Sequence, residues 1–325
     1  MNGRRLARRL EELLDARGER GRRIVRLRRR RNPRGSSHRL EDVHVEFADG
    51  SSGDFVLKAF GAAATGAGTV VRPGFVTDPY REVWAYERLL RQLDVPTLRA
   101  FGTLGAGGGS DRLVIERGAG DTLSTEGDIA AWEAATRWLG SFHRSGRSLL
   151  GRAAASGHLL VRDGPSHRRW LRRARRIARE GGRRGEVARL ESIAAAFDRA
   201  VGVLEGEPPT LLHGEFYASN VLVERGAAGW RVRPVDWESV AVGPAALDLA
   251  AVVSGDWAPA VRAGLLSAYA EAASPHPAPG PEALAAGELV MAVQWLGWSS
   301  RWRPPAEHAR DWLAVATEAA GRVAA

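Results

Sequence analysis

The chain of 325 residues contains no cysteine, and it lacks the features that mark secreted and membrane proteins. Without cysteine there are no disulfides, no thiolate metal sites and no cysteine nucleophile. No run of about eighteen apolar residues occurs, and the amino terminus lacks the apolar core of a signal peptide. We therefore expect a cytoplasmic protein that does not enter a membrane.

Lysine is almost absent as well. Of the 47 basic residues, all but Lys58 are arginine. A coding bias towards arginine explains the imbalance, but it does not explain why this lysine persists. Lys58 lies near the end of the apolar run 54–60, which predicts a strand. A lysine presents a compact, strongly hydrated ammonium where arginine presents a bulky planar group. Protein kinases grip nucleotide phosphates with a lysine on such a strand.

The segment 209–223 contains the strongest motif. Two apolar stretches flank a polar loop in which His213, Glu215 and Asn220 keep the spacing of the kinase catalytic loop. A carboxylate has to reach the acceptor hydroxyl while an amide oxygen reaches Mg²⁺, and a short loop can direct both into one cleft. Sixteen residues after Asn220, Asp236 ends a strand-like run and takes the place of a metal-binding aspartate. The pattern indicates phosphoryl transfer.

Several motifs combine into one resemblance, which covers roughly residues 20 to 320. They are His213-Gly214-Glu215 through Asn220, Asp236-Trp237-Glu238, Gly243-Pro244 and Asp248-Leu249-Ala250. Together they resemble the aminoglycoside phosphotransferase and choline kinase family. The resemblance implies an α+β, bilobal, protein-kinase-like fold, with an antiparallel sheet and a helix in the small lobe and a larger, mainly helical lobe. It also implies that a hydroxyl group is phosphorylated with ATP, or with GTP as the alternative nucleotide, and with Mg²⁺.

The resemblance also implies a role for each matching residue. Lys58 would hold the α- and β-phosphates, and Glu82 would pair with Lys58. Glu215 would be the catalytic base, while Asp248 would order the loop rather than touch substrate. The catalytic candidates are Glu215, His213 and Asp236, and the metal candidates are Asn220 and Asp236.

Glu215 departs from the family, which usually has aspartate at this position. The extra methylene moves the carboxylate by about one bond length, and a misplacement of about 1 Å can cost on the order of 10²-fold in rate. Glu215 is therefore either a base matched to an acceptor that lies further out or a sign of weakened catalysis.

Before the motif, the pattern predicts a small lobe. A helix over 4–16 is followed by strands at 23–30, 42–47 and 54–60 that form an antiparallel meander. The loop 32–37 falls where the family covers the nucleotide phosphates, although a plain hairpin turn explains it equally well. Its candidate phosphate contacts are Gly35, Ser36 and Ser37. The expected division of the chain is an N-terminal basic helix over 1–20, a nucleotide-binding lobe over 21–117 and a catalytic lobe over 118–325.

Two further elements complete the expected nucleotide site. Glu82, Tyr86 and Leu89 share one face of a helix, from which Glu82 could pair with Lys58, with Glu87 as a possible substitute. The strand 112–116 leads into a glycine loop that would be the hinge, and there the resemblance implies contact with the adenine edge. Glu116 is the nucleotide candidate at this point.

The segment 162–189 contributes most of the net charge of +9. Its helix, 167–179, is expected to bury Trp170, Ala174, Ile177 and Ala178 and to expose arginine elsewhere. This face is either an ordinary solvated surface or a site that attracts an anion. Because the family shapes its acceptor site in this region, a basic insert argues against a polycationic aminoglycoside. A phosphorylated or carboxylated sugar, or an acidic peptide, fits better.

Other functions remain open beside a small-molecule kinase. The acceptor could be a serine or threonine of a biosynthetic precursor peptide. The chain could instead be a pseudokinase, which Glu215 favours, or an anion- or nucleic-acid-binding module, which the net charge favours. Nucleic acid is the weaker interpretation because it leaves the ordered polar motif unexplained.

Beyond that motif, we expect one apolar helix from Asp248 through Trp257 to Tyr269.

Overall fold

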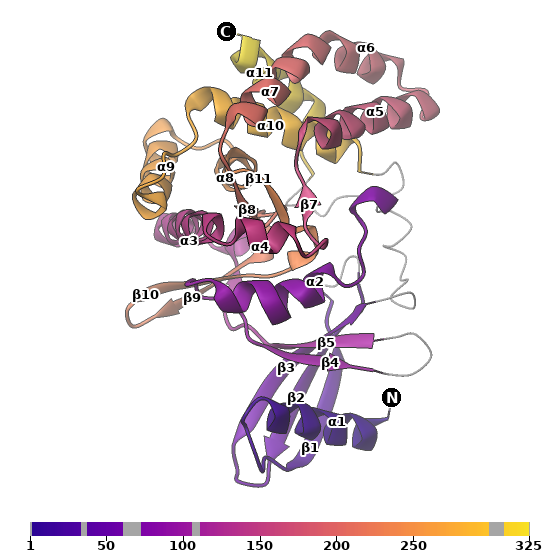
Figure 1. Cartoon of the computed structure of the whole chain (residues 1–325), viewed down its shortest axis with the longest axis vertical. Helices are drawn as coiled ribbons and strands as arrows, with labels where there is room; N and C mark the ends of the chain where they lie inside the picture. The colour runs from indigo at the N-terminus through magenta and orange to yellow at the C-terminus, as the bar shows by residue number, and fades with distance from the viewer. Residues whose placement is uncertain (1, 34–37, 61–72, 106–110, 299–308, 325) are drawn as a thin grey trace.

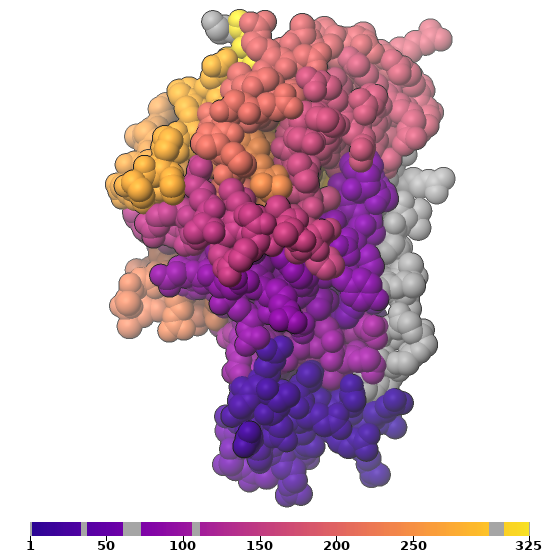
Figure 2. Space-filling view, viewed as in Figure 1, coloured from indigo at the N-terminus to yellow at the C-terminus, as the bar shows by residue number. Residues whose placement is uncertain are grey.

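The computed structural model describes residues 2–33, 38–60, 73–105, 111–298 and 309–324. An antiparallel sheet with one helix forms one end of the molecule, and most of the helices gather at the other (Figure 1). In the filled surface, the N-terminal sheet is a narrow lower end beneath a broader upper body (Figure 2). The predicted α+β arrangement is confirmed.

The N-terminal sheet has five strands in the order β1-β2-β3-β5-β4, all antiparallel. They are β1 (Ile24–Arg31), β2 (Leu40–Phe47), β3 (Ser52–Phe60), β4 (Ala100–Leu104) and β5 (Asp111–Glu116). Lys58 lies in the central strand, where it is aligned with Leu40 on β2 and Leu113 on β5. The meander of the first three strands is confirmed, with ends shifted by up to two residues.

Helix α1 (Gly3–Ala16) covers one face of this sheet, and its bounds agree with the helix predicted over 4–16. Its Asn2 cap accepts a hydrogen bond from the Arg5 amide, and its leucines repeat at helical spacing. Leu6, Leu10 and Leu14 are at most 1% exposed and pack in one cluster with the strand residues. Burial of three leucines contributes roughly 1.5 to 3 kcal/mol each, so the leucine stripe, and not the arginines around it, fixes the helix.

The segment that carries Glu82 is an irregular helix. Its parts are α2 (Arg81–Trp84), a π-helical turn η3 (Ala85–Leu89) and a 3-10 turn η4 (Leu90–Gln92), and a short turn η2 (Gly74–Val76) precedes them. Tyr86 and Leu89 are buried on its inner face, as predicted. A π turn inside a helix is uncommon, and many of the known examples lie at functional sites.

The larger part of the chain combines helices with two small three-stranded sheets. The helices are α3 (Ile129–Arg147), α4 (Leu150–Ala154), α5 (Gly164–Glu180), α6 (Arg184–Ser192), α7 (Ala194–Gly206), α8 (Ala246–Val253), α9 (Pro259–Ala273), α10 (Pro281–Leu296) and α11 (Trp312–Ala324). One sheet has the order β10-β9-β6, with β6 (Asp121–Thr122), β9 (Val221–Gly226) and β10 (Gly229–Pro234). The other has the order β7-β11-β8, with β7 (Leu160–Val161), β8 (Pro209–Leu212) and β11 (Ala241–Pro244).

The prediction of a single apolar helix from Asp248 to Tyr269 is wrong. The chain forms α8 and α9 with a break over 254–258. Gly255 takes φ +152°, which an L-residue in a helix does not adopt, and Pro259 starts the second helix. Apolar periodicity continues across the break because both helices bury a face in the same core.

Helix α5 buries all four predicted residues. Its arginines face acidic side chains on the following helices. Arg175 lies 2.8 Å and Arg179 3.0 Å from Glu191, and Arg168 lies 3.1 Å from Asp198. Much of this basic face is therefore an ion-paired, solvated surface. None of the helices in the described part of the chain is long and apolar enough to cross a membrane.

Candidate active site

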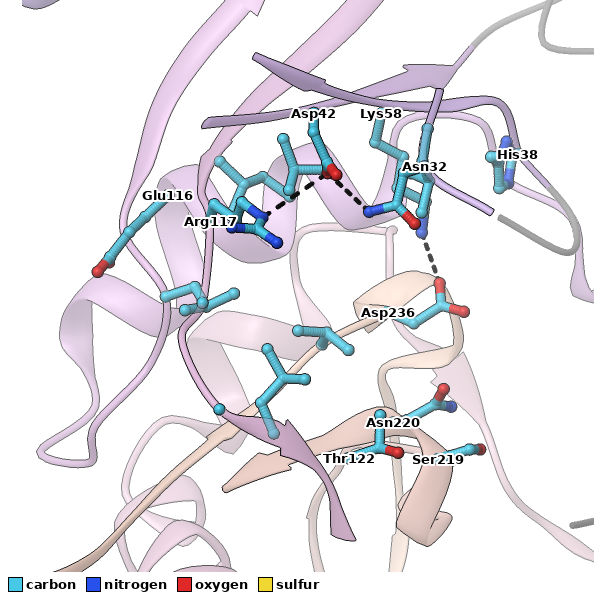
Figure 3. Close-up of a pocket in the computed structure, with 18 of the residues that line it drawn as sticks. Asn32, His38, Asp42, Lys58, Glu116, Arg117, Thr122, Ser219, Asn220 and Asp236 are labelled. Atoms are coloured by element: carbon cyan, nitrogen blue, oxygen red, sulfur yellow. Dashed lines mark hydrogen bonds and ion pairs between the residues drawn. The ribbon is translucent and has the colours of Figure 1, made fainter. Parts of the chain in front are cut away.

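A cavity of about 430 Å³ lies between the N-terminal sheet and the β9–β10 hairpin. Lys58 approaches it from the sheet, while Ser219, Asn220 and Asp236 approach it from the opposite side (Figure 3). Apolar side chains line it from both sides: Leu40, Val56, Leu98, Ile115, Leu222 and Val235. An apolar cavity with a few converging charged groups is the usual form of a small-molecule site.

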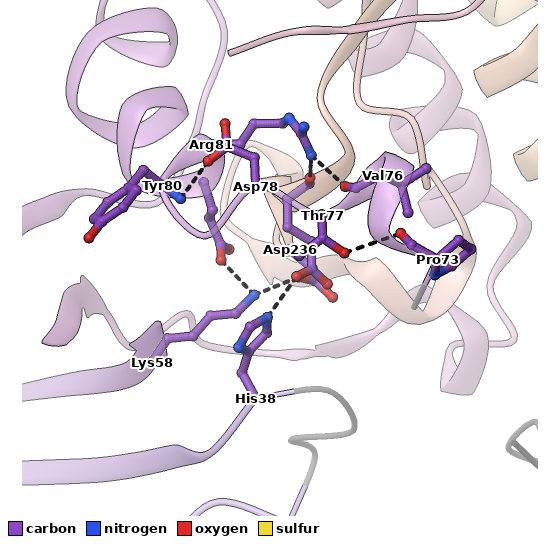
Figure 4. Close-up of polar contacts among 11 residues, drawn as sticks. His38, Lys58, Pro73, Val76, Thr77, Asp78, Tyr80, Arg81 and Asp236 are labelled. Atoms are coloured by element: carbon purple, nitrogen blue, oxygen red, sulfur yellow. Dashed lines mark hydrogen bonds and ion pairs between the residues drawn. The ribbon is translucent and has the colours of Figure 1, made fainter. Parts of the chain in front are cut away.

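Lys58 joins the two parts of the molecule at this cavity. Its Nζ lies 2.7 Å from Oε2 of Glu82 and 2.5 Å from Oδ1 of Asp236 (Figure 4). Burial alone would lower the pKa of Lys58, but the charges of Asp236 and Glu82 outweigh it and raise the pKa above the ordinary value. The ammonium is therefore charged and fixed in direction. The predicted pairing with Glu82 is confirmed, whereas Glu87 lies near Arg17 instead.

Arg81, next to Glu82, fastens this helix to the rest of the molecule. Its guanidinium donates to the carbonyls of Val76 and Glu238, each at 2.8 Å (Figure 4). It also donates to the His158 carbonyl at 2.6 Å. The residue is 5% exposed. Three carbonyl acceptors around one buried cation fix the position of Glu82 relative to the loop that carries Asp236.

The loop between β8 and β9 is shaped by buried polar contacts. Oδ2 of Asp248 accepts from the His213 amide at 2.6 Å, and Oδ1 accepts from the Gly214 amide at 2.9 Å. Gly214 has φ +85°, and a Cβ there would lie 2.0 Å from the Ser239 carbonyl oxygen. Glycine is therefore required at this position. The prediction that Asp248 orders the loop is confirmed.

His213 is fully buried and supports the loop from behind. Its Nε2–H donates to the Val235 carbonyl at 2.9 Å, and its Nδ1 accepts from the Glu215 amide at 3.4 Å. Burial lowers the pKa of His213 against the opposing charges of Asp248 and Asp236. A neutral imidazole with one donor and one acceptor fits both contacts. The ring therefore links the Glu215 loop to the strand before Asp236.

Three carboxylates converge beside this loop. Glu215, Asp236 and Glu238 each place one oxygen within 4.8 Å of the others. The Asn220 side-chain amide donates to the Glu215 carbonyl at 3.0 Å, and Asn220 also lines the cavity. Asp236 has φ +67°, a strained conformation for a non-glycine residue that is frequent at functional sites. Carboxylate and amide oxygens are the ligands that Mg²⁺ prefers, so the donor set fits that ion.

A comparison of the sequence with protein-family models shows which family the chain belongs to. A model of the phosphotransferase enzyme family matches residues 17–286, which include the Lys58 strand, the 213–220 loop and Asp236. The chain belongs to the phosphotransferase enzyme family. Its resemblance to that family, and its class as a phosphotransferase, are thereby confirmed.

Solved structures of other phosphotransferases share the fold. The chain is similar to a microcompartment-associated aminopropanol kinase, with 16% identity, a TM-score of 0.57 and coverage of 91% of this chain and 90% of that one. Spectinomycin phosphotransferase in complex with ADP and spectinomycin has 14% identity, a TM-score of 0.55 and 98% coverage of both chains. A GDP complex of aminoglycoside 2′-phosphotransferase has 12% identity, a TM-score of 0.56 and coverage of 98% and 97%. No curated protein sequence matches significantly.

The other residues predicted to contact the nucleotide were Gly35, Ser36, Ser37 and Glu116. Gly35, Ser36 and Ser37 lie outside the described residues. Glu116 borders the cavity, but its carboxylate accepts from the Arg99 amide at 3.1 Å and lies 3.4 Å from Arg233. Its side chain therefore holds the hinge together.

Two residues of the site had no predicted role. His38 Nε2 lies 2.8 Å from Oε2 of Glu238, so the loop before β2 reaches the carboxylate cluster. Glu238 belongs to the recognised Asp236-Trp237-Glu238 motif, and its spacing from Asp236 could have suggested a role. No sequence signal pointed to His38.

Proposed function

We propose that this phosphotransferase transfers the γ-phosphoryl group of ATP or GTP, with Mg²⁺, to a hydroxyl group of a small molecule. The observation that carries the proposal is the placement of Lys58. Its ammonium is fixed between Glu82 and Asp236 at the edge of a cavity of about 430 Å³, beside three converging carboxylates. Phosphoryl transfer depends mainly on positioning and charge neutralisation, and this arrangement provides both.

Each residue has a distinct role in this proposal. Lys58 binds the α- and β-phosphates, and Glu82 directs its ammonium. Asn220 and Asp236 would hold Mg²⁺, which when bound neutralises charge on the phosphates. Glu215 accepts the proton of the attacking hydroxyl. The apolar walls of the cavity would enclose the nucleobase of ATP or GTP, and the backbone that follows β5 would contact the edge of that nucleobase.

The acceptor is best sought among anionic or sugar-like alcohols. The solved relatives act on compounds as different as aminopropanol and spectinomycin, so the fold alone does not select one. The ion pairs of α5 with Glu191 and Asp198 reduce the basic field of that helix, whereas Arg172 is exposed on it. We expect a modest preference for an anion and no strong attraction for a polycation.

Nucleotide binding can be tested before the acceptor is known. The melting temperature would be measured with ATP and with GTP, each with and without Mg²⁺, for the unmodified protein and for Asp236→Asn. A ligand at a hundred times its Kd stabilises by about 2.7 kcal/mol. We expect stabilisation that needs Mg²⁺ and is lost in the variant, while Asp198→Asn, on the exposed end of an α5 ion pair, keeps it.

Three outcomes would contradict the proposal, each in a different part. Equal stabilisation of Asp236→Asn would remove the metal assignment. Absence of stabilisation by either nucleotide would favour an anion-binding protein that has kept the kinase fold. Stabilisation without any turnover over a broad acceptor panel would instead favour a pseudokinase, as the glutamate at position 215 allows.

A further inference from the structure

A second cavity, of about 410 Å³, adjoins the cavity that contains Lys58 and has no part in the proposed reaction. It is bordered by the C-terminal end of α1, by the helical segment that follows Glu82, and by the chain that leads into β4. Sites for small molecules occupy about 300 to 1,000 Å³. The cavity is therefore large enough for a ligand, and its lining indicates which kind.

The polar part of the lining is basic. Three guanidinium groups border the cavity, from Arg17, Arg91 and Arg99, and none of the described residues that line it is acidic. None of these arginines lines the cavity of Lys58. A guanidinium has five N–H donors and no acceptor, so the lining favours a ligand whose oxygens accept hydrogen bonds and carry negative charge.

Two of the three arginines are held in place by other contacts. Nε of Arg17 donates to the Phe101 carbonyl at 2.8 Å, and its guanidinium lies 3.7 Å from Glu87. Arg99 forms an ion pair with Glu19, and its Cζ lies 4.7 Å from the centre of the Phe101 ring. Side chains that are already ordered lose little conformational entropy when a ligand binds.

Arg91 is the cation of this cavity that has no partner of its own. It lies in η4, is exposed, and has neither a hydrogen bond nor an ion pair to any residue that the structure describes. Glu87 and Glu19 offset part of the charge of the other two arginines. The cavity therefore has a modest positive charge, which suits one anionic group rather than a polyanion.

The apolar part of the lining forms a wall towards the cavity of Lys58. Tyr86 and Leu98 line both cavities, and Leu90 adds to the wall from the second one. Tyr86 is 2% exposed, yet its hydroxyl has no hydrogen-bond partner within the described part of the chain. Such a buried group is uncommon and calls for an explanation, of which a bound molecule is one.

We propose that this cavity is a second ligand site, which takes a small organic molecule with a single phosphate group. The guanidinium groups bind the phosphate oxygens, a geometry for which arginine is well suited. The organic part packs on Leu90, Leu98 and the Tyr86 ring, and so against the helical segment that carries Glu82. The site does not depend on the proposed function, because its arginines take no part in that reaction.

Calorimetric titration of the whole protein with phenyl phosphate tests the site, in the presence of saturating ADP and Mg²⁺. We expect inorganic phosphate and benzyl alcohol to bind at least about tenfold more weakly, because each provides only one of the two kinds of contact. A Kd above about 10 mM for phenyl phosphate would overturn the inference. Equal affinity for inorganic phosphate would also overturn it, since the apolar wall would then have no role.

Arg91→Gln removes the cation that has no partner, and exposure of this side chain makes the substitution safe for the fold. The Kd for phenyl phosphate should rise about fivefold or more, as expected for loss of a charged hydrogen bond. The matched control is Arg88→Gln, an exposed arginine of the same segment that lies beside Trp84 and Leu149 instead. It should change the Kd by less than about twofold. Equal effects of the two variants would show a general attraction to basic surface and overturn the inference.

A second variant removes the space and keeps the charge. Ala16 is exposed at the end of α1 and borders the cavity, so Ala16→Phe should fill it and abolish measurable binding of phenyl phosphate. The melting temperature reports whether the variant is folded. Unchanged affinity in folded Ala16→Phe would place the probe elsewhere and overturn the inference.

Lys58→Gln separates this site from the nucleotide cavity. We expect its affinity for phenyl phosphate to be unchanged. Loss of binding in Lys58→Gln, together with retention in Arg91→Gln, would place the probe in the nucleotide cavity and overturn the inference. If the unmodified protein does not bind ADP, the proposed function fails, and the variants at Arg91, Ala16 and Lys58 still decide whether the second site exists.

Discussion

The cleft around Lys58 and the surface formed by α5 and α6 both contain ion pairs, but the pairs of the cleft are buried and those of the surface are exposed to solvent. In the cleft, the Lys58 and Glu82 side chains are each 10% exposed. On the surface, Arg179 and Glu191 are 60% and 45% exposed at a similar separation. Exposed pairs contribute about 0–1 kcal/mol, whereas loss of one partner of a buried pair typically costs about 3–5 kcal/mol. Distance alone therefore says little about which charges matter, and burial decides.

The largest effect is expected for Lys58→Arg. The guanidinium is planar and larger than an ammonium, so it cannot occupy the point between Glu82 and Asp236 without displacing them. Phosphate release from ATP should fall by about 10² or more. The reverse exchange Arg29→Lys, in the Arg29–Glu41 pair of the N-terminal sheet, is the control and should change activity little. Full activity of Lys58→Arg would show that charge without shape suffices.

Glu82→Gln should have the next largest effect. Lys58 would keep Asp236 but lose the charge that directs it from the helix. A hydrogen bond to a charged group contributes about 1.5–3 kcal/mol, which corresponds to a fall in kcat of about 10- to 100-fold. Glu87→Gln lies on the same helix, contacts Arg17 and should stay within about twofold. Equal losses in both variants would mean that the helix, and not the pair, is what the substitutions disturb.

A pH effect is expected in the sheet. Burial would raise the pKa of Glu41, but a hydrogen bond from Arg29 and the charges of Arg112 and Arg39 outweigh it and hold the pKa below 4.5. A lowered carboxyl pKa stabilises the fold above about pH 4.5, and this contribution is lost as the pH falls through the lowered value. Glu41→Gln should lower the melting temperature near pH 7, with a difference that shrinks below about pH 4.5. The half-exposed Glu46→Gln serves as reference, and a difference that does not depend on pH would contradict this.

The smallest effect is expected at the surface. Glu191→Gln removes the partner of both Arg175 and Arg179. Because these side chains are partly hydrated, the free energy of unfolding in urea should change by less than about 1 kcal/mol, and salt should reduce the difference further. A loss of about 3 kcal/mol would show that this surface is as structurally demanding as the cleft.

Sequence reasoning predicted those features whose signal is local. Lys58 on its strand and the polar loop between the two apolar stretches of 209–223 are set by nearby residues, and the motif spacing located Asp236. The ion pair of Lys58 with Glu82 could be proposed because the helix face and the resemblance pointed the same way. The division at residues 20 and 117 stays a prediction, as do the nucleotide and metal roles of the site residues.

Contacts between distant segments escaped prediction. His38 meets Glu238 across 200 residues, and Arg162 reaches the loop at Gly214 through the parallel pairing of β7 with β11. A two-residue strand has no periodicity to detect. The break at Gly255 was missed for another reason, since one glycine in an apolar run is compatible with a continuous helix until its φ is known.

Arg81 limits how this protein can be controlled. In regulated kinases the helix that bears the glutamate is moved to switch the enzyme between inactive and active forms. Here such a movement would break three hydrogen bonds from one buried guanidinium, to the carbonyls of Val76, His158 and Glu238. The helix is therefore held in one position relative to the loop that carries Asp236, and we expect a swing of this helix to be an unfavourable way of switching the phosphotransferase.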